Sequence, residues 1–171
     1  MDASGYLYAI AAVGMSFAGL SVLTMILRQM LGGQLTRFDS FVTRTLVQLG
    51  FMTTVGSILP PLLILFGTLA PLAWRISSGV IAVILGSWAL TFPHRRHTVN
   101  PTRLPLQVVL FLLAMNIAAL TLAANALVVP GELLPAVYAA AVTAILIGAG
   151  MLFLFTVEHW YDSTIGHPPP K

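Results

Sequence analysis

The spacing of charged residues constrains this chain more than any other feature of its sequence. Between Arg44 and Arg95 the only charged side chain is Arg75. The fifty residues between those two arginines would form about 75 Å of α-helix, and about 20 apolar residues cross the hydrocarbon core of a bilayer. This segment therefore predicts two membrane-spanning helices joined by a tight turn, for which Gly67 and Pro71 are suited.

The whole chain has too little charge to cover the surface of a water-soluble domain. Of its 171 residues, 58% are hydrophobic and 8% are charged, whereas soluble domains carry about 25% charged residues. We therefore predict an all-α, polytopic membrane protein that forms a single domain over residues 1–171. Pro93 is expected to end the third span. The five predicted spans are about 5–28, 42–68, 72–92, 104–129 and 135–160, followed by a tail at 161–171.

Basic residues are divided unevenly between the two ends that alternating spans create. One end receives Arg28, Arg37, Arg44, Arg95, Arg96, Arg103 and Lys171, and the other receives only Arg75. Because cytoplasmic loops are rich in Lys and Arg, this distribution predicts an N-terminus outside and a C-terminus inside. It also accounts for the net charge of +3, so no nucleic-acid partner is predicted. The compact loops favour a bacterial cytoplasmic membrane.

Polar residues and prolines within the predicted spans suggest a pathway for an ion or small solute. Pro60 and Pro61 cannot donate to the carbonyls of residues 56 and 57, so the second span should be kinked near its middle. Broken helices near the midplane expose carbonyls that coordinate cations in transporters. A static kink, with interhelical hydrogen bonds among the polar residues, is the alternative interpretation. The candidate pathway residues are Thr53, Thr54, Ser57, Pro60, Pro61, Asn116, Thr121 and Asn125.

Small residues form ridges at intervals of four on two of the predicted spans. The ridge on the third span is Ser78, Ala82 and Gly86, and that on the fifth is Ala136, Ala140, Ala144 and Gly148. Ridges of this kind let membrane helices approach closely. They predict either packing within one chain or a subunit interface in a homo-oligomer, for which the fifth span is the better candidate.

Histidines and carboxylates are predicted to gather at the end that carries most of the basic residues. Imidazole and carboxylate ligands on a helix bundle can bind zinc or iron. The alternative is a belt of polar and aromatic side chains at the membrane interface. At the opposite end, Arg75 is expected to pair with Glu132. The candidate metal ligands are His94, His97, Glu158, His159 and Asp162.

These features favour a transport protein, an oligomeric channel or pore subunit for an ion or small solute. The alternative is a non-catalytic membrane scaffold or accessory subunit that packs through its small-residue faces. The chain has no cysteine and no nucleotide-binding motif, so catalysis is the less expected function and no cofactor is predicted. An intramembrane enzyme that uses the histidines and carboxylates of the end rich in basic residues with a metal is the third alternative. The expected partners are the lipid bilayer, with anionic headgroups at Arg95, Arg96 and Arg103, and further copies of the chain or another membrane protein.

Overall fold

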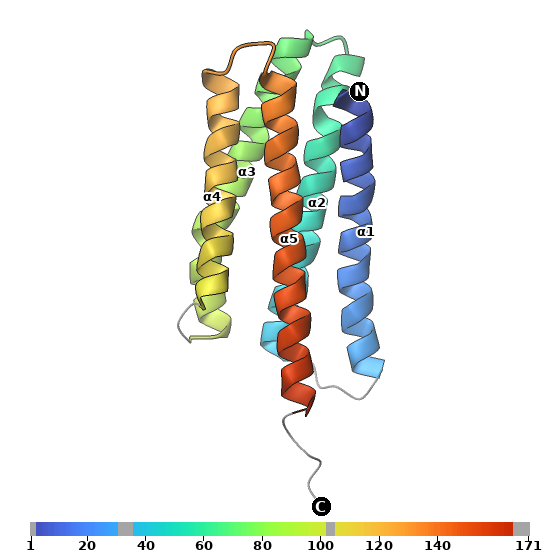
Figure 1. Cartoon of the computed structure of the whole chain (residues 1–171), viewed down its shortest axis with the longest axis vertical. Coiled ribbons are helices and arrows are strands. Elements are labelled where there is room, and N and C mark those ends of the chain that lie inside the picture. Colours follow the sequence, from blue (N-terminus) through green and yellow to red (C-terminus); the bar gives the residue numbers. More distant parts are fainter. Residues whose placement is uncertain (1–2, 31–35, 102–104, 166–171) are drawn as a thin grey trace, which may run out of the picture.

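The computed structural model of the chain is an all-helical bundle (Figure 1). It describes residues 3–30, 36–101 and 105–165, and within these ranges the side chains from residue 4 to residue 157. Each helix is long and apolar enough to cross a membrane, which confirms the predicted number of candidate spans. The helices are α1 (Ala3–Met30), α2 (Arg37–Leu65), α3 (Ala70–Val99), α4 (Leu106–Leu127) and α5 (Leu134–Ile165).

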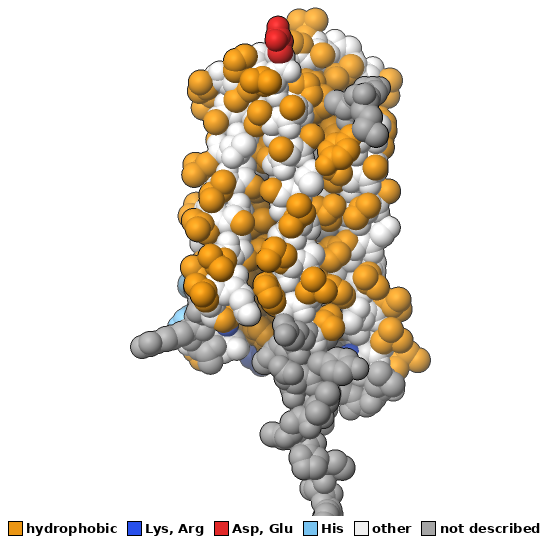
Figure 2. Space-filling model, in the orientation of Figure 1, with side chains coloured by type: hydrophobic (Ala, Val, Ile, Leu, Met, Phe, Trp, Pro, Cys, Tyr) orange, Lys and Arg blue, Asp and Glu red, His pale blue; other side chains and the backbone are white. Residues whose placement is uncertain are grey.

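The last helix, α5, is central to the bundle in the sense that it has contacts with every other helix. By contrast, α1 contacts only α2 and α5. In Figure 1, α5 lies between α4 and α1, with α3 and α2 behind it. Figure 2 shows apolar side chains along the length of the bundle, an acidic side chain at one end, and Lys or Arg side chains at the other. We call the latter, where α1 leads into α2 and α3 into α4, the basic end.

At the basic end, α2 begins earlier than the predicted residue 42 because Thr36 caps it. Thr36 Oγ1 accepts a hydrogen bond from the backbone N of Asp39 (3.1 Å), and Asp39 Oδ2 accepts one from the backbone N of Thr36 (2.9 Å). This reciprocal arrangement is a capping box, which satisfies two donors at the helix start. Arg28 of α1 also forms an ion pair with Asp39 at 2.6 Å. The cap therefore joins the end of α1 to the start of α2.

The predicted turn at Gly67 is confirmed. Gly67 has a positive φ of 85°, a conformation that glycine adopts without steric cost. The backbone N of Thr68 donates to Leu63 O (3.1 Å), and that of Gly67 donates to Ile64 O (2.9 Å). These two bonds form a Schellman motif, which satisfies the last carbonyls of α2 and ends the helix at Leu65.

The predicted positions of the prolines in α2 and of the end of α5 were wrong. Because α2 spans Arg37–Leu65, Pro60 and Pro61 lie in its last two turns and not near its middle. The helix is continuous through both prolines. α5 continues to Ile165, past the predicted end at residue 160. The remainder of the predicted tail, residues 166–171, lies outside the described residues.

The prediction that Pro93 ends α3 was also wrong. α3 continues to Val99, where the backbone N of Asn100 donates to Arg96 O (2.8 Å). Phe92 and Arg96 are four residues apart and both are buried, so an uninterrupted helix keeps both side chains on the face that points into the bundle. Burial of this face offsets the backbone hydrogen bond that Pro93 removes.

α1 and α2 meet at a pair of glycines that the sequence analysis did not connect. A Cβ atom added at Gly50 would lie 2.7 Å from the carbonyl oxygen of Gly14 and 3.0 Å from Ala18 Cβ. One turn further along α2, Thr54 Oγ1 donates to Ala11 O of α1 at 3.2 Å. The absence of side chains at this crossing is what allows the two backbones to touch.

Gly50→Ala should therefore lower the thermal stability of the protein. The added methyl group would overlap the backbone of α1, and overpacking of this kind costs about 1–3 kcal/mol. The matched control is Gly19→Ala on α1, because a Cβ there meets nothing within 4 Å. The measurement is the midpoint of thermal unfolding in detergent, followed by circular dichroism. Equal midpoints for the two variants would contradict this packing.

Candidate functional site

The polar pathway candidates Thr53, Thr54, Ser57 and Asn125 are buried inside the bundle, as is Pro60. Thr53 Oγ1 donates to Leu49 O (2.9 Å) of its own helix, and Thr54 is held in the seam between α1 and α2. The Ser57 hydroxyl has no hydrogen-bond partner among the described atoms. A hydroxyl that bonds to the preceding turn of its own helix is satisfied without lining a channel. The two threonines thus contribute to packing.

Asn125 joins α4 to two other helices. Its Nδ2 donates to Ser78 Oγ of α3 (2.8 Å) and to Leu134 O at the start of α5 (3.2 Å). Its Oδ1 is buried and has no partner among the described atoms. Buried amides in membrane helices need partners, and both of the helices that α4 contacts, α3 and α5, supply one here. Asn125 is thus part of a junction between helices.

A side chain from α5 donates a hydrogen bond to the backbone carbonyl that Pro60 leaves without a donor. Pro60 has no backbone N–H, so it cannot donate to the oxygen of Gly56. Tyr138 Oη donates to that oxygen at 2.6 Å, and Tyr138 is fully buried. Pro61, the next residue, is half-buried. The Gly56 carbonyl is therefore already hydrogen-bonded, which removes one ligand from the cation pathway that the prolines suggested.

The last two pathway candidates, Asn116 and Thr121, lie half-buried on α4. Asn116 Nδ2 donates to Leu112 O (2.8 Å), and Thr121 Oγ1 donates to Ile117 O (2.9 Å), so each bonds to its own helix. Residues five apart on a helix point about 140° apart. Within the described part of a single chain, the eight pathway candidates therefore do not converge on one path.

Arg75 caps the end of α4 and does not form the predicted ion pair with Glu132. Its guanidinium donates to the carbonyl oxygens of Ala126 (3.2 Å), Leu127 (3.4 Å) and Val129 (3.3 Å). The last carbonyls of a helix lack partners within the helix and carry partial negative charge, so a cation stabilises them. Glu132 is exposed in the loop that follows. The two residues are tied to the same loop without contacting each other as an ion pair.

Only two of the five candidate metal ligands belong to the side chains that the structure describes. His94 and His97 are exposed on α3. The side chains of Glu158, His159 and Asp162 lie outside the described set. Within that set, no three His, Asp or Glu side chains lie close enough together to hold a metal ion.

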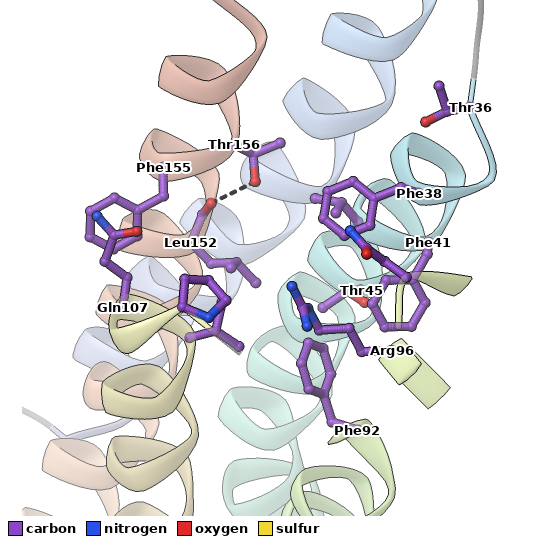
Figure 3. A pocket seen from close by; sticks show the side chains of 14 residues that line it. Thr36, Phe38, Phe41, Thr45, Phe92, Arg96, Gln107, Leu152, Phe155 and Thr156 are labelled. Carbon is purple, nitrogen blue, oxygen red and sulfur yellow. Dashed lines mark hydrogen bonds between the residues drawn. The ribbon is translucent and has the colours of Figure 1, made fainter. Parts of the chain in front are cut away.

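A pocket of about 590 Å³ lies at the basic end, between α2, α3, α4 and α5 (Figure 3). This volume is within the range of about 300–1,000 Å³ that small-molecule sites occupy. We call it the basic-end pocket. Its polar lining residues are Thr36, Thr45, Arg96, Asn100, Gln107 and Thr156. Its apolar lining residues are Phe38, Phe41, Val42, Phe92, Pro105, Val108, Leu152 and Phe155.

Arg96 is the one charged residue among the described residues that line this pocket. Its side chain is 6% exposed. In Figure 3, Phe92 and Arg96 of α3 lie between labelled side chains of α2 and those of α5. The preceding residue, Arg95, instead donates to Gln48 Oε1 on α2 at 3.4 Å. Because consecutive helical residues point about 100° apart, the continued helix gives the two adjacent arginines different surroundings.

The lining of the basic-end pocket combines one guanidinium with aromatic rings. A guanidinium binds a carboxylate or phosphate through two parallel hydrogen bonds, and aromatic rings cover the apolar part of a ligand. Phe38, Phe41 and Thr45, which line this pocket, were not predicted as site residues. Their spacing of three and four residues places them on one face of α2, a pattern that indicates a buried face but does not reveal a hollow beside it.

Tyr138→Phe should destabilise the protein by about 1 kcal/mol, because it leaves the Gly56 carbonyl buried without a donor. Tyr8→Phe is the control, since it makes the same chemical change at a side chain that is 54% exposed. The unfolding midpoints of both variants in detergent test this prediction. A midpoint for Tyr138→Phe no lower than that for Tyr8→Phe would show that the hydrogen bond is unimportant for stability.

Comparison of the chain with protein-family models, with curated proteins and with solved structures found no match. No activity, ligand or partner therefore passes to this chain from a relative. What it binds must follow from its own residues. Among the residues described, the basic-end pocket is a hollow that has a charged residue, Arg96, in its own lining.

Proposed function

We propose that the protein is a non-catalytic integral membrane protein that binds an anionic amphiphile in its basic-end pocket. The burial of Arg96 in the wall of a mostly aromatic and aliphatic hollow carries this proposal. A guanidinium in the wall of a mostly apolar hollow attracts an acidic group strongly, because apolar surroundings screen its charge less than water does. A ligand with an acidic group and an apolar tail matches both parts of the lining. This geometry agrees with a membrane scaffold or accessory subunit that holds such a ligand.

The proposal includes an orientation, in which the basic end faces the cytoplasm. Five of the described arginines lie at the basic end, whereas Arg75 lies at the opposite end. This division agrees with the excess of basic residues in cytoplasmic loops. The N-terminus would then lie outside and the C-terminus inside, in a bacterial cytoplasmic membrane. An amphiphile would enter the pocket from the inner leaflet or from the cytoplasm. The five arginines are Arg28, Arg37, Arg44, Arg95 and Arg96.

A pore between copies of the chain is the second candidate function. The exposure of Ala136, Ala140 and Ala144 on α5 favours it, since these small side chains face away from the bundle. The fourth residue of that ridge, Gly148, is buried, and a Cβ added there would lie 2.5 Å from Met115 Cε of α4. Three exposed small residues at intervals of four provide a surface on which a helix of a second copy could pack closely. The path for an ion or small solute would then run between chains.

The binding proposal predicts that the purified protein binds dodecyl phosphate in a neutral maltoside detergent. Arg96→Gln should weaken this binding by about tenfold or more, because hydrogen bonds between charged groups are stronger than neutral ones. Inorganic phosphate and zwitterionic dodecylphosphocholine should bind more weakly than dodecyl phosphate. Dissociation constants from ligand-dependent thermal stabilisation provide the measurement.

Two further variants separate loss of the ligand from loss of the fold. Arg44→Gln removes an exposed arginine from the same end and should keep the affinity of the unmodified protein. Val108→Phe fills part of the pocket at a half-buried position without changing charge, and should also weaken binding. The proposal is overturned if the unmodified protein does not bind dodecyl phosphate. It is also overturned if Arg96→Gln and Arg44→Gln bind it equally.

The pore candidate predicts that Ala140→Trp dissociates an oligomer and abolishes ion flux. A bulky ring on the exposed ridge of α5 would prevent close approach of a second helix. Val83→Trp on α3 is the control, since Val83 is 71% exposed and lies on a different helix. Flux of a panel of ions into liposomes and the mass of the protein in detergent provide the readouts. A monomer without flux in the unmodified protein would refute the pore.

A further inference from the structure

A second hollow of about 420 Å³ lies between α2 and α3. Its walls include Val47 and Phe51 of α2 and Ile81 and Ile84 of α3, and Gln48 is the one polar residue among those that line it. Phe51 is 58% exposed and Ile84 is 40% exposed, so the hollow faces away from the bundle interior. We call it the α2–α3 groove. In a membrane, this apolar surface would face lipid.

The guanidinium of Arg95 donates a hydrogen bond to Gln48, the polar residue that lines this groove. Gln48 Oε1 accepts hydrogen bonds from Arg95 Nη2 (3.4 Å) and from Trp88 Nε1 (3.2 Å). Arg95 lies about one turn before the end of α3, whereas Gln48 lies about three turns into α2 from the basic end. The Arg95 side chain is therefore directed along the bundle toward the groove. Long basic side chains near helix ends ordinarily extend the other way, toward the membrane interface.

We propose that the α2–α3 groove binds an acyl chain of an anionic bilayer phospholipid, with the headgroup phosphate at Arg95. The apolar walls match the chain, and the guanidinium at the end nearest the basic end matches the phosphate. Gln48 accepts a hydrogen bond from one of the five N–H groups of Arg95 and so holds this side chain in position. The other N–H groups of Arg95 can donate to the phosphate. This site is independent of the basic-end pocket, since it uses a different arginine and none of the residues that line that pocket.

The headgroup part of the proposal is tested with phosphatidylglycerol and phosphatidylcholine of identical acyl chains. The full-length protein is purified in mixed micelles with both lipids, and retained lipid is counted by native mass spectrometry. We expect the unmodified protein to retain phosphatidylglycerol over phosphatidylcholine by about fivefold, the preference that one arginine near a lipid headgroup provides. Arg95→Gln should remove this preference, Arg95→Lys should keep part of it, and the control Arg44→Gln should keep all of it.

The acyl-chain part is tested by filling the groove. Val55 also lines the groove and is 38% exposed, so Val55→Phe adds volume there without disturbing the bundle interior. It should lower retention of both lipids, whereas Val83→Phe, on the lipid-facing side of α3 outside the groove, should not. Val55→Phe should still bind dodecyl phosphate, because Val55 does not line the basic-end pocket.

Two results would overturn the lipid site. One is an equal loss of headgroup preference in Arg95→Gln and Arg44→Gln, which would mean that only the net charge of the basic end attracts the lipid. The other is unchanged lipid retention in Val55→Phe with normal thermal unfolding. Failure of dodecyl phosphate to bind would refute the basic-end pocket and would leave this site unaffected, so the two proposals fail separately.

Discussion

The hydrogen bond from Tyr138 to the Gly56 carbonyl is the interaction on which the rest of the bundle depends. An apolar bundle provides no water for an unpaired backbone group, so each carbonyl freed by proline needs a partner from the protein. Tyr138 supplies that partner from the central helix, and its ring also contacts Trp74 of α3, with 5.5 Å between ring centroids. α2, α3 and α5 therefore meet at a single buried side chain.

Features that depend on local chemistry were predictable from the sequence. The five apolar segments and the turn at Gly67 follow from hydropathy and from glycine's backbone freedom. The continuation of α3 past Pro93 was not predictable in this way. It depends on burial of Phe92 and Arg96 against α2 and α5, which are distant in sequence. The capping of α4 by Arg75 likewise depends on carbonyls that lie about fifty residues further along the chain.

For the candidate site residues, too, the local sequence shows the residue type, whereas the role of the side chain depends on how distant helices pack. Threonines and amides in apolar helices resemble the lining of a pathway, yet Thr53, Asn116 and Thr121 bond to the preceding turn of their own helices. Aromatic residues on the buried face of α2 resemble an ordinary core, yet they line a hollow. The sequence pattern of a face shows that it is covered, but which neighbour covers it, and how completely, depends on how the other helices are arranged.

The central position of α5 has a consequence for the order in which the bundle can form during synthesis. α1 with α2, and α3 with α4, can pair as antiparallel hairpins as soon as each second helix has been made. The helix that contacts all four others, α5, follows them in the sequence and is therefore made after them. Until then, Met115 lacks its neighbour Gly148, and the Gly56 carbonyl lacks the hydrogen bond from Tyr138. The first four helices can form the contacts between α1 and α2, α2 and α3, and α3 and α4 before α5 has been made, and the part of the core that they share with α5 is completed afterwards.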